Sequence, residues 1–268
     1  MRHVSESCMN ILDKIRGRVR KLPDWAVVAA LMAFALIVRL FYLWGHPLES
    51  RDGIAYIRFT QEWYDLGAAA LPDYLTIKPP LYCYLSRALM YLGFSVESAT
   101  LTVSLAAGVL LLVPVYITGR ALWKERAAAV WLCVLASVMP VFVRYSCLRL
   151  REGLYLLLAS ATVCAWILAM KKIHMLRASA ACAFLAMLNL MCRYEAAELV
   201  VCGALTLPFA GLFPGWRWKL AGKVVLAFWG GVLFGAAVIM ILPGMPNMLA
   251  IYFNRVYMQC LGTSINPL

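Results

Sequence analysis

Long apolar runs constrain the fold of this chain more than any other feature. Seven such runs recur along it, at residues 25–44, 98–122, 127–145, 153–170, 178–192, 196–213 and 224–243. An α-helix rises ~1.5 Å per residue, so ~20 residues cross the ~30 Å hydrocarbon core of a bilayer. Most of the runs have about this length. The sequence therefore predicts an all-α, multi-pass membrane protein with about seven spanning helices.

Composition agrees with a lipid environment. Of the 268 residues, 64% are apolar and 14% are charged, whereas soluble domains lie nearer one half and one quarter. The chain has too few polar residues to cover a water-facing surface. The first run is too long for the core of a signal peptide, and no small-residue cleavage site follows it, which predicts a retained anchor.

Basic residues gather in the connections between runs. The net charge of +12 would suggest nucleic-acid binding in a soluble protein. Here the Arg and Lys residues cluster in segments 1–24, 120–126, 171–177 and 217–223. These segments follow alternate ends of the runs, as the positive-inside rule requires. We therefore expect a plasma or inner membrane protein with a cytoplasmic N-terminus, and topology signals rather than a nucleic-acid partner.

The same pattern predicts the organisation of the chain. Segment 1–24 is the cytoplasmic N-terminal segment, residues 25–243 form the transmembrane domain, and residues 244–268 form an external tail. Residues 45–97 form an external loop that is slightly acidic. It is read as two short interfacial helices. One runs from about Gly53 to Leu66, with Gly67 as its stop signal.

The second interfacial helix begins at Pro79-Pro80, because proline suits a first helical turn. It extends to Leu92, which makes it about 14 residues long and too short for a full crossing. Counting it as a span would also place the basic segment 120–126 outside. The prediction of seven spans therefore depends on this helix staying at the membrane surface.

Two further polar stretches fall at the outer ends of runs. Residues 144–152 (RYSCLRLRE) carry three arginines on the side where the positive-inside rule disfavours them. They either snorkel to outer-leaflet phosphates or bind a phosphate or pyrophosphate group. Arg193, Glu195 and Glu198 follow the fifth run, where Arg193 either forms a structural ion pair with Glu198 or Glu152 or belongs to a site.

These stretches all reach one membrane face, so acids and bases surround an interfacial cleft there. The acids are Asp52, Glu152 and Glu195, and the bases are Lys78, Arg149, Arg151 and Arg193. Tyrosines and tryptophans near them, Tyr56 included, are typical of an interfacial aromatic belt. A carboxylate can take a proton from an acceptor while cations hold a departing phosphate. This combination favours group transfer from a lipid phosphate.

The order of motifs resembles a known family. Asp52-Gly-Ile-Ala-Tyr56 is followed by Lys78-Pro79-Pro80-Leu81, by Gly119-Arg120-Ala-Leu-Trp123 and then by Glu152. Over residues 25–213 the chain is similar to the GT-C superfamily of membrane glycosyltransferases. The nearest branches are the protein O-mannosyltransferases, the lipid A aminoarabinose transferases and their bacterial family 39-like relatives.

The resemblance implies a GT-C fold in which the first external loop forms two juxtamembrane helices over the active site. It implies an inverting transfer from a polyprenyl-phosphate-linked sugar to a lipid, glycan or protein acceptor. Asp52 would be the general base, with Tyr56 in the same motif, and Lys78 would contact the donor phosphate. Glu152 matches the second-loop acid, a position where Asp is commoner.

Further roles rest partly on the resemblance and partly on charge. Arg193 and Glu195 resemble the family's R-x-E step after the fifth span. Arg149 and Arg151 are expected to bind phosphate on charge grounds. The three His and nine Cys show no usual metal-ligand spacing. Asp52 and Glu152 can ligate Mg²⁺ or Mn²⁺ through their carboxylate oxygens. The lysine-containing relatives instead suggest that cationic side chains take the role of the metal.

Two alternatives remain open. Relatives of this kind are typically longer, with more spans, so the chain would be a short or truncated member. It would then serve as a catalytically incomplete membrane subunit or a lipid-binding protein. A transporter or channel would need ionisable groups near mid-membrane. The one candidate, Arg39, is expected to snorkel from near a span end.

Overall fold

The computed structural model describes residues 22–45, 49–67, 80–123, 125–207, 209 and 218–242. All regular secondary structure in these ranges is helical. The external tail predicted over 244–268 lies outside them, as do Lys78 and most of the N-terminal segment. The all-α prediction is therefore confirmed for the part of the chain that the structure describes.

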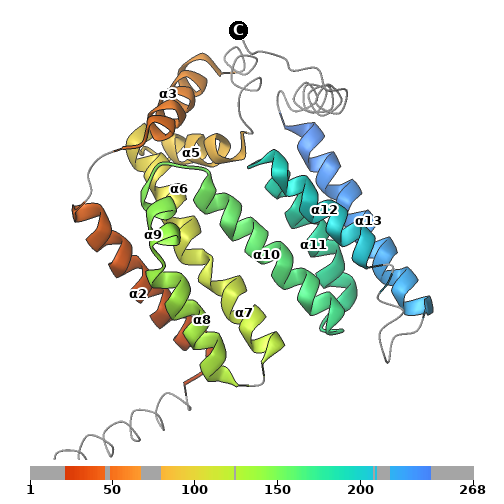
Figure 1. Ribbon diagram of the computed structural model, residues 1–268. Coiled ribbons are helices and arrows are strands. Elements are labelled where there is room, and N and C mark those ends of the chain that lie inside the picture. Colours follow the sequence, from red (N-terminus) through yellow and green to blue (C-terminus); the bar gives the residue numbers. More distant parts are fainter. Residues whose placement is uncertain are drawn as a thin grey trace, which may run out of the picture.

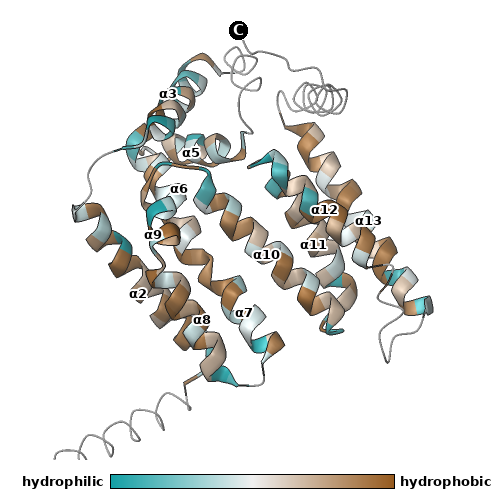
Figure 2. Ribbon diagram, viewed as in Figure 1, coloured by the Kyte–Doolittle hydropathy of each residue, from teal (hydrophilic) through white to brown (hydrophobic). Residues whose placement is uncertain are grey.

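Within these ranges, four helical stretches are long and apolar enough to cross a membrane. They are α2 (Asp24–Gly45), α6 with α7 (Val96–Leu110 and Leu112–Leu122), α10 (Glu152–Met170) and α13 (Trp218–Ile241). A fifth candidate is the pair α8 (Arg126–Val138) and α9 (Pro140–Cys147), which is bent by 57°. The middle parts of the long helices are hydrophobic, and polar residues collect toward their ends (Figure 2).

The remaining apolar runs form shorter helices. They are α11 (Met175–Leu190) and α12 (Ala197–Thr206), with the single 3₁₀ turn η2 (Tyr194–Ala196) between them. The break falls at the Arg-Tyr-Glu sequence that divides the two runs, as the sequence predicted. With 16 and 10 described residues, neither helix has the length of a full span by itself. The structure supports four or five spans, and the count of seven stays a prediction.

Proline accounts for both interruptions in the longer helices. Pro114 has no N–H to donate to the carbonyl four residues earlier, and the helix breaks at Leu111, between α6 and α7. Pro140 occupies the first position of α9, directly after the bend at Met139. The bend directs the end of α9 toward the loop that carries Arg149 and Arg151. By contrast, α13 passes through Gly230-Gly231 without a break.

Arg39 is completely buried, so the expectation that it snorkels is wrong. Its Nε donates to Ser146 Oγ of α9 (2.7 Å), and its two terminal nitrogens donate to the carbonyls of Ala35 (3.0 Å) and Gly108 of α6 (3.1 Å). It forms no ion pair with any described carboxylate. Neutral acceptors supplied by neighbouring helices hold it inside. One cation thereby ties α2, α6 and the bent α9 together.

Small residues allow α13 to approach α11 closely. A Cβ added to Gly231 would lie 2.3 Å from the carbonyl oxygen of Ala180, and one added to Gly235 would lie 2.6 Å from Met187 Cβ. The spacing of four residues places both glycines on one face of α13, as in many membrane helix pairs. This contact anchors the C-terminal end of the described bundle.

Two helices lie across the ends of the long ones, α3 (Arg51–Leu66) and α5 (Leu81–Tyr91) (Figure 1). The Ser50 hydroxyl caps α3 by accepting from the Gly53 N–H (2.9 Å), and the helix ends at Gly67 with a positive φ of 61°. The predicted boundaries of both helices are confirmed to within a few residues. Their placement at the membrane surface remains part of the proposal below.

Candidate functional site

Four segments from distant parts of the chain meet at one end of the bundle. They are α3, α5, the loop before α10 and the turn after α11. The Leu81 N–H at the start of α5 donates to the Met191 carbonyl (2.9 Å). One hydrophobic cluster contains Tyr56, Leu150 and Cys192, one from each of the other three segments. This packing brings the polar side chains of these segments together.

Arg151 and Glu152 stand at the centre of this end. Arg151 occupies the N-cap position of α10 and Glu152 begins the helix, with side chains only 18% and 22% exposed. The Nε of Arg151 lies 4.0 Å from Glu152 Oε1. Nε and Nη1 of Arg151 are buried and find no hydrogen-bond acceptor among the described residues, and Glu152 Oε2 finds no donor there. The N-terminal dipole of α10 adds positive potential at the same place. The arrangement is suited to receive an anion.

Arg193 links this pair to the turn after α11. Its guanidinium lies 3.5 Å from Glu152 Oε1 and 2.7 Å from Glu195 Oε1, and it covers the ring of Tyr155 at 5.3 Å. The hydrogen bond from Arg193 lowers the pKa of Glu195 to about 2. The same bond raises the pKa of Arg193. Of the two ion pairs left open for Arg193, the structure forms the one with Glu152.

Arg149 has a different environment from Arg151. Its side chain forms an ion pair with Glu49, and its Nε donates to the carbonyl of Glu97 (3.1 Å). The Glu49 carboxylate also accepts from the backbone N–H groups of Ser50 (3.1 Å) and Arg149 (3.2 Å). Arg149 thus fastens the start of α3 to α6 and to the loop before α10. Glu49 was missed in the sequence, where it is one acid among several in the external loop.

Tyr56 faces the Arg151–Glu152 pair from α3. Its ring is 1% exposed and packs edge-on against Tyr82 of α5, with centroids 5.2 Å apart. Burial raises the pKa of Tyr56, and the charges of Arg151 and Glu152 also act on its phenol. The sequence assigned Tyr56 both to the site and to an interfacial belt. The structure places it in the interior, against the site.

Asp52 lies one turn before Tyr56 on α3 and is exposed. It lines a shallow depression of about 440 Å³ with Arg51 and Phe59, and its charge acts on the Tyr56 phenol. Asp52 therefore belongs to the same end of the bundle as Glu152. Lys78, from the second of the motifs, lies outside the described residues.

Asn189 is a second residue that the sequence reading missed. It is completely buried near the end of α11, one turn before Cys192. Neither its Nδ2 nor its Oδ1 has a hydrogen-bond partner among the described residues. A single Asn in an apolar run was the only available signal.

Metal binding and disulfides receive no support from the described residues. No group of three or more His, Cys, Asp or Glu side chains there is placed to hold a metal ion. A divalent cation at Asp52 and Glu152 stays a prediction. Cys83, Cys147 and Cys192 near this end are buried and form no disulfide with a described residue. No protein-family model, curated protein or solved structure matches the chain.

Proposed function

We propose that the chain is a GT-C-like membrane glycosyltransferase that moves a sugar from a polyprenyl-phosphate carrier to a lipid, glycan or protein acceptor. The reaction takes place at the non-cytoplasmic face, with inversion at the anomeric carbon. The single observation that carries the proposal is that Nε and Nη1 of Arg151, beside Glu152, are buried and find no acceptor among the described residues. The start of α10, where Arg151 is the N-cap residue, lies at the end of the bundle that α3 and α5 cover (Figure 1).

A phosphate suits this position for electrostatic reasons. Buried donors without acceptors are costly, and an Arg fork matches the oxygens of a phosphate. The start of α10 adds its dipole to the same point. The lipid tail of the carrier would then lie among the spans while its phosphate rests at their polar end. Because Arg149 is already engaged by Glu49, we assign it to holding the loop rather than to binding the donor.

The chemistry follows from these positions. As the bond between the sugar C1 and the carrier phosphate oxygen breaks, the leaving phosphate takes the electron pair and gains negative charge. Arg151 stabilises that charge, together with Lys78 from the motif that resembles the family, while Arg193 stays paired with Glu195 and Glu152. The acceptor oxygen forms the new bond to C1, and its proton passes to the Asp52 carboxylate. Glu152 orients the two arginines.

Binding and transfer are measured separately. Purified full-length protein in nanodiscs is titrated with undecaprenyl phosphate, and the shift in its thermal unfolding midpoint is recorded. We expect Arg151→Gln to weaken this binding at least tenfold, since it removes a charged donor pair. Arg58→Gln is the matched control, because Arg58 forms an ion pair with Glu62 along the exposed side of α3. Equal binding by wild type and Arg151→Gln contradicts the assignment.

Sugar transfer is followed with radiolabelled polyprenyl-phosphate sugars in membranes prepared from cells that express the chain. Loss of a general base lowers rates by about 10²–10⁴-fold, so Asp52→Asn should bind the carrier normally and transfer at least 100-fold more slowly. Transfer by Asp52→Asn at the wild-type rate contradicts the general-base role. Carrier binding without any transfer by the wild type favours the alternative, a catalytically incomplete lipid-binding subunit.

A further inference from the structure

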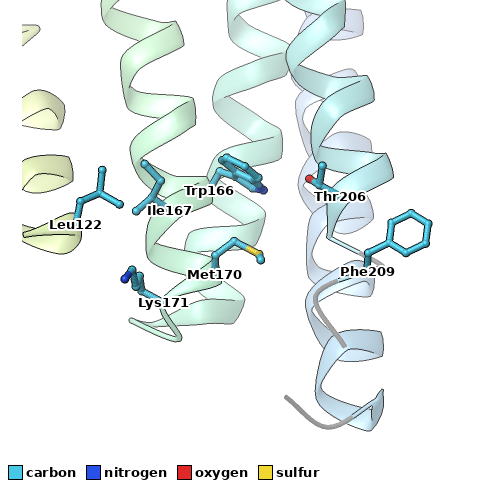
Figure 3. A pocket seen from close by; sticks show the side chains of 7 residues that line it. All are labelled: Leu122, Trp166, Ile167, Met170, Lys171, Thr206 and Phe209. Atoms are coloured by element: carbon cyan, nitrogen blue, oxygen red, sulfur yellow. The ribbon is translucent and has the colours of Figure 1, made fainter. Parts of the chain in front are cut away.

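An apolar groove opens at the end of the bundle opposite the candidate site (Figure 3). It lies between α7, α10 and α12 and has a volume of about 450 Å³, within the range of about 300–1,000 Å³ that small-molecule sites occupy. The residues that matter here are Leu122, Trp166, Ile167, Lys171, Thr206 and Phe209. All of its wall except the Lys171 and Thr206 tips is apolar.

The position of the groove along α10 sets its depth in the membrane. α10 is one of the spanning helices, and it ends at Met170, directly before Lys171. Trp166 stands one turn earlier and reaches across the groove toward α12 (Figure 3). Amphipathic Trp rings favour the level where acyl chains meet headgroups. The groove therefore lies at the boundary between hydrocarbon and headgroups.

Charge at the mouth of the groove selects the occupant. Lys171 is exposed and forms no ion pair with the described residues. Two arginines at the same end are engaged, because Arg120 and Arg126 lie 3.6 and 3.1 Å from the Asp24 carboxylate. An unengaged ammonium above an apolar groove matches a phosphate joined to acyl chains.

Trp166 supplies a second polar feature. Its indole N–H is buried and has no hydrogen-bond acceptor among the described residues. The nearby Thr206 hydroxyl donates to the Cys202 carbonyl (2.6 Å) and so keeps its own acceptor capacity. A small rotation of the indole ring would offer the N–H to an oxygen inside the groove. The ester oxygens of a phospholipid lie deeper in the membrane than its phosphate. The Trp166 N–H likewise lies deeper along α10 than Lys171.

We propose that the groove binds one anionic phospholipid from the leaflet on its side of the membrane. An acyl chain lies along Ile167 and Phe209, an ester oxygen accepts from Trp166, and the phosphate lies against Lys171. The site is at the other end of the bundle from Arg151, so it does not depend on the proposed transferase activity. Its occupant would fill the space between α7 and α12.

The headgroup preference of the wild-type protein tests this directly. The full chain is reconstituted in nanodiscs with equal amounts of phosphatidylglycerol and phosphatidylcholine, and retained lipids are counted by native mass spectrometry. One basic residue at the surface favours an anionic lipid by a factor of about five. We expect that ratio in the wild type and a ratio near one in Lys171→Gln. Ile167→Trp, which fills the groove, should lower retention of both lipids.

Lys172→Gln is the matched control, since it removes the same charge from the neighbouring residue outside the groove lining. It should keep the wild-type ratio. A wild-type ratio near one overturns the proposal, as does an equal loss of preference in Lys172→Gln, which would indicate diffuse surface attraction. Detection of a lipid-free dimer also overturns it, because a second copy would then cover the groove. The wild-type ratio decides the question even where a variant fails to fold.

Discussion

Arg39 and Arg151 both have buried donor atoms, but these differ in whether they find acceptors among the described residues. The Arg39 nitrogens donate to Ser146, Ala35 and Gly108, whereas two nitrogens of Arg151 have no acceptor in the described chain. Buried polar groups are almost always paired in native structures. We therefore infer that a cation whose buried donors are all paired has a structural role. A cation whose buried donors find no acceptor is a candidate for ligand binding.

The structural role of Arg39 predicts an unequal cost for two serine substitutions. Ser146→Ala removes the acceptor of Arg39 Nε and leaves a buried charged donor unpaired, which costs about 1.5–3 kcal/mol. Ser137→Ala removes only a bond within α8, to the Cys133 carbonyl, and should cost at most about 1 kcal/mol. Free energies of unfolding from denaturant titration in micelles measure both. Equal costs would show that Arg39 does not depend on Ser146.

The Arg193–Glu195 pair predicts a pH dependence with a definite sign. The folded pKa of Glu195 is about 2, below its ordinary value of 4.5, because Arg193 donates to it. A depressed pKa stabilises the fold above the unfolded value, and this contribution disappears as the pH falls from about 4.5 toward 2. The difference in unfolding midpoint between wild type and Glu195→Gln should be present at pH 7 and shrink over that window. A difference that stays constant down to pH 2 would contradict the assignment.

At the scale of helices, local signals predicted the boundaries well and the tertiary partners poorly. Gly67 and Pro80 act on their own backbone, so the end of α3 and the start of α5 could be predicted from the sequence. The burial of Arg39 depends on Ser146, which is 107 residues away. No local pattern indicates such a pairing. The engagement of Arg149 by Glu49 was missed for the same reason.

The close contact between α11 and α13 gives a prediction for adjacent glycines. Gly231→Ala places a Cβ 2.3 Å from the Ala180 carbonyl, so the helices must separate. Gly230→Ala meets nothing within 4 Å and should be neutral or slightly stabilising, because Ala favours helix over Gly by up to about 1 kcal/mol. Thermal unfolding in one detergent compares the two variants, with a clear loss expected for Gly231→Ala alone. Similar midpoints would mean that this interface is not tight.

At the scale of the whole molecule, the two ends of the bundle have different tasks. The end beneath α3 and α5 gathers Arg151, Glu152 and Arg193, and two nitrogens of Arg151 find no acceptor in the ranges that the structure describes. The opposite end holds the ion pairs of Arg120 and Arg126 with Asp24, and the groove beside Lys171. Basic residues prefer the cytoplasmic side, so the second end should face the cytoplasm. The sequence predicted this polarity from loop charge, but which arginines remain available required the structure.

The bent pair α8–α9 decides both the orientation and the number of crossings. If it crosses the membrane once, Glu125 before it and Lys172 after α10 lie on the same side, as their ends of the bundle do in Figure 1. The nine native cysteines are first replaced. Asp65→Cys, Glu125→Cys and Lys172→Cys are then introduced one at a time, and each variant is treated with a membrane-impermeant maleimide. We expect labelling of position 65 in intact cells, and of positions 125 and 172 only after permeabilisation. Labelling of 125 and 172 from opposite sides would make the bent pair a re-entrant loop and remove one span from the seven.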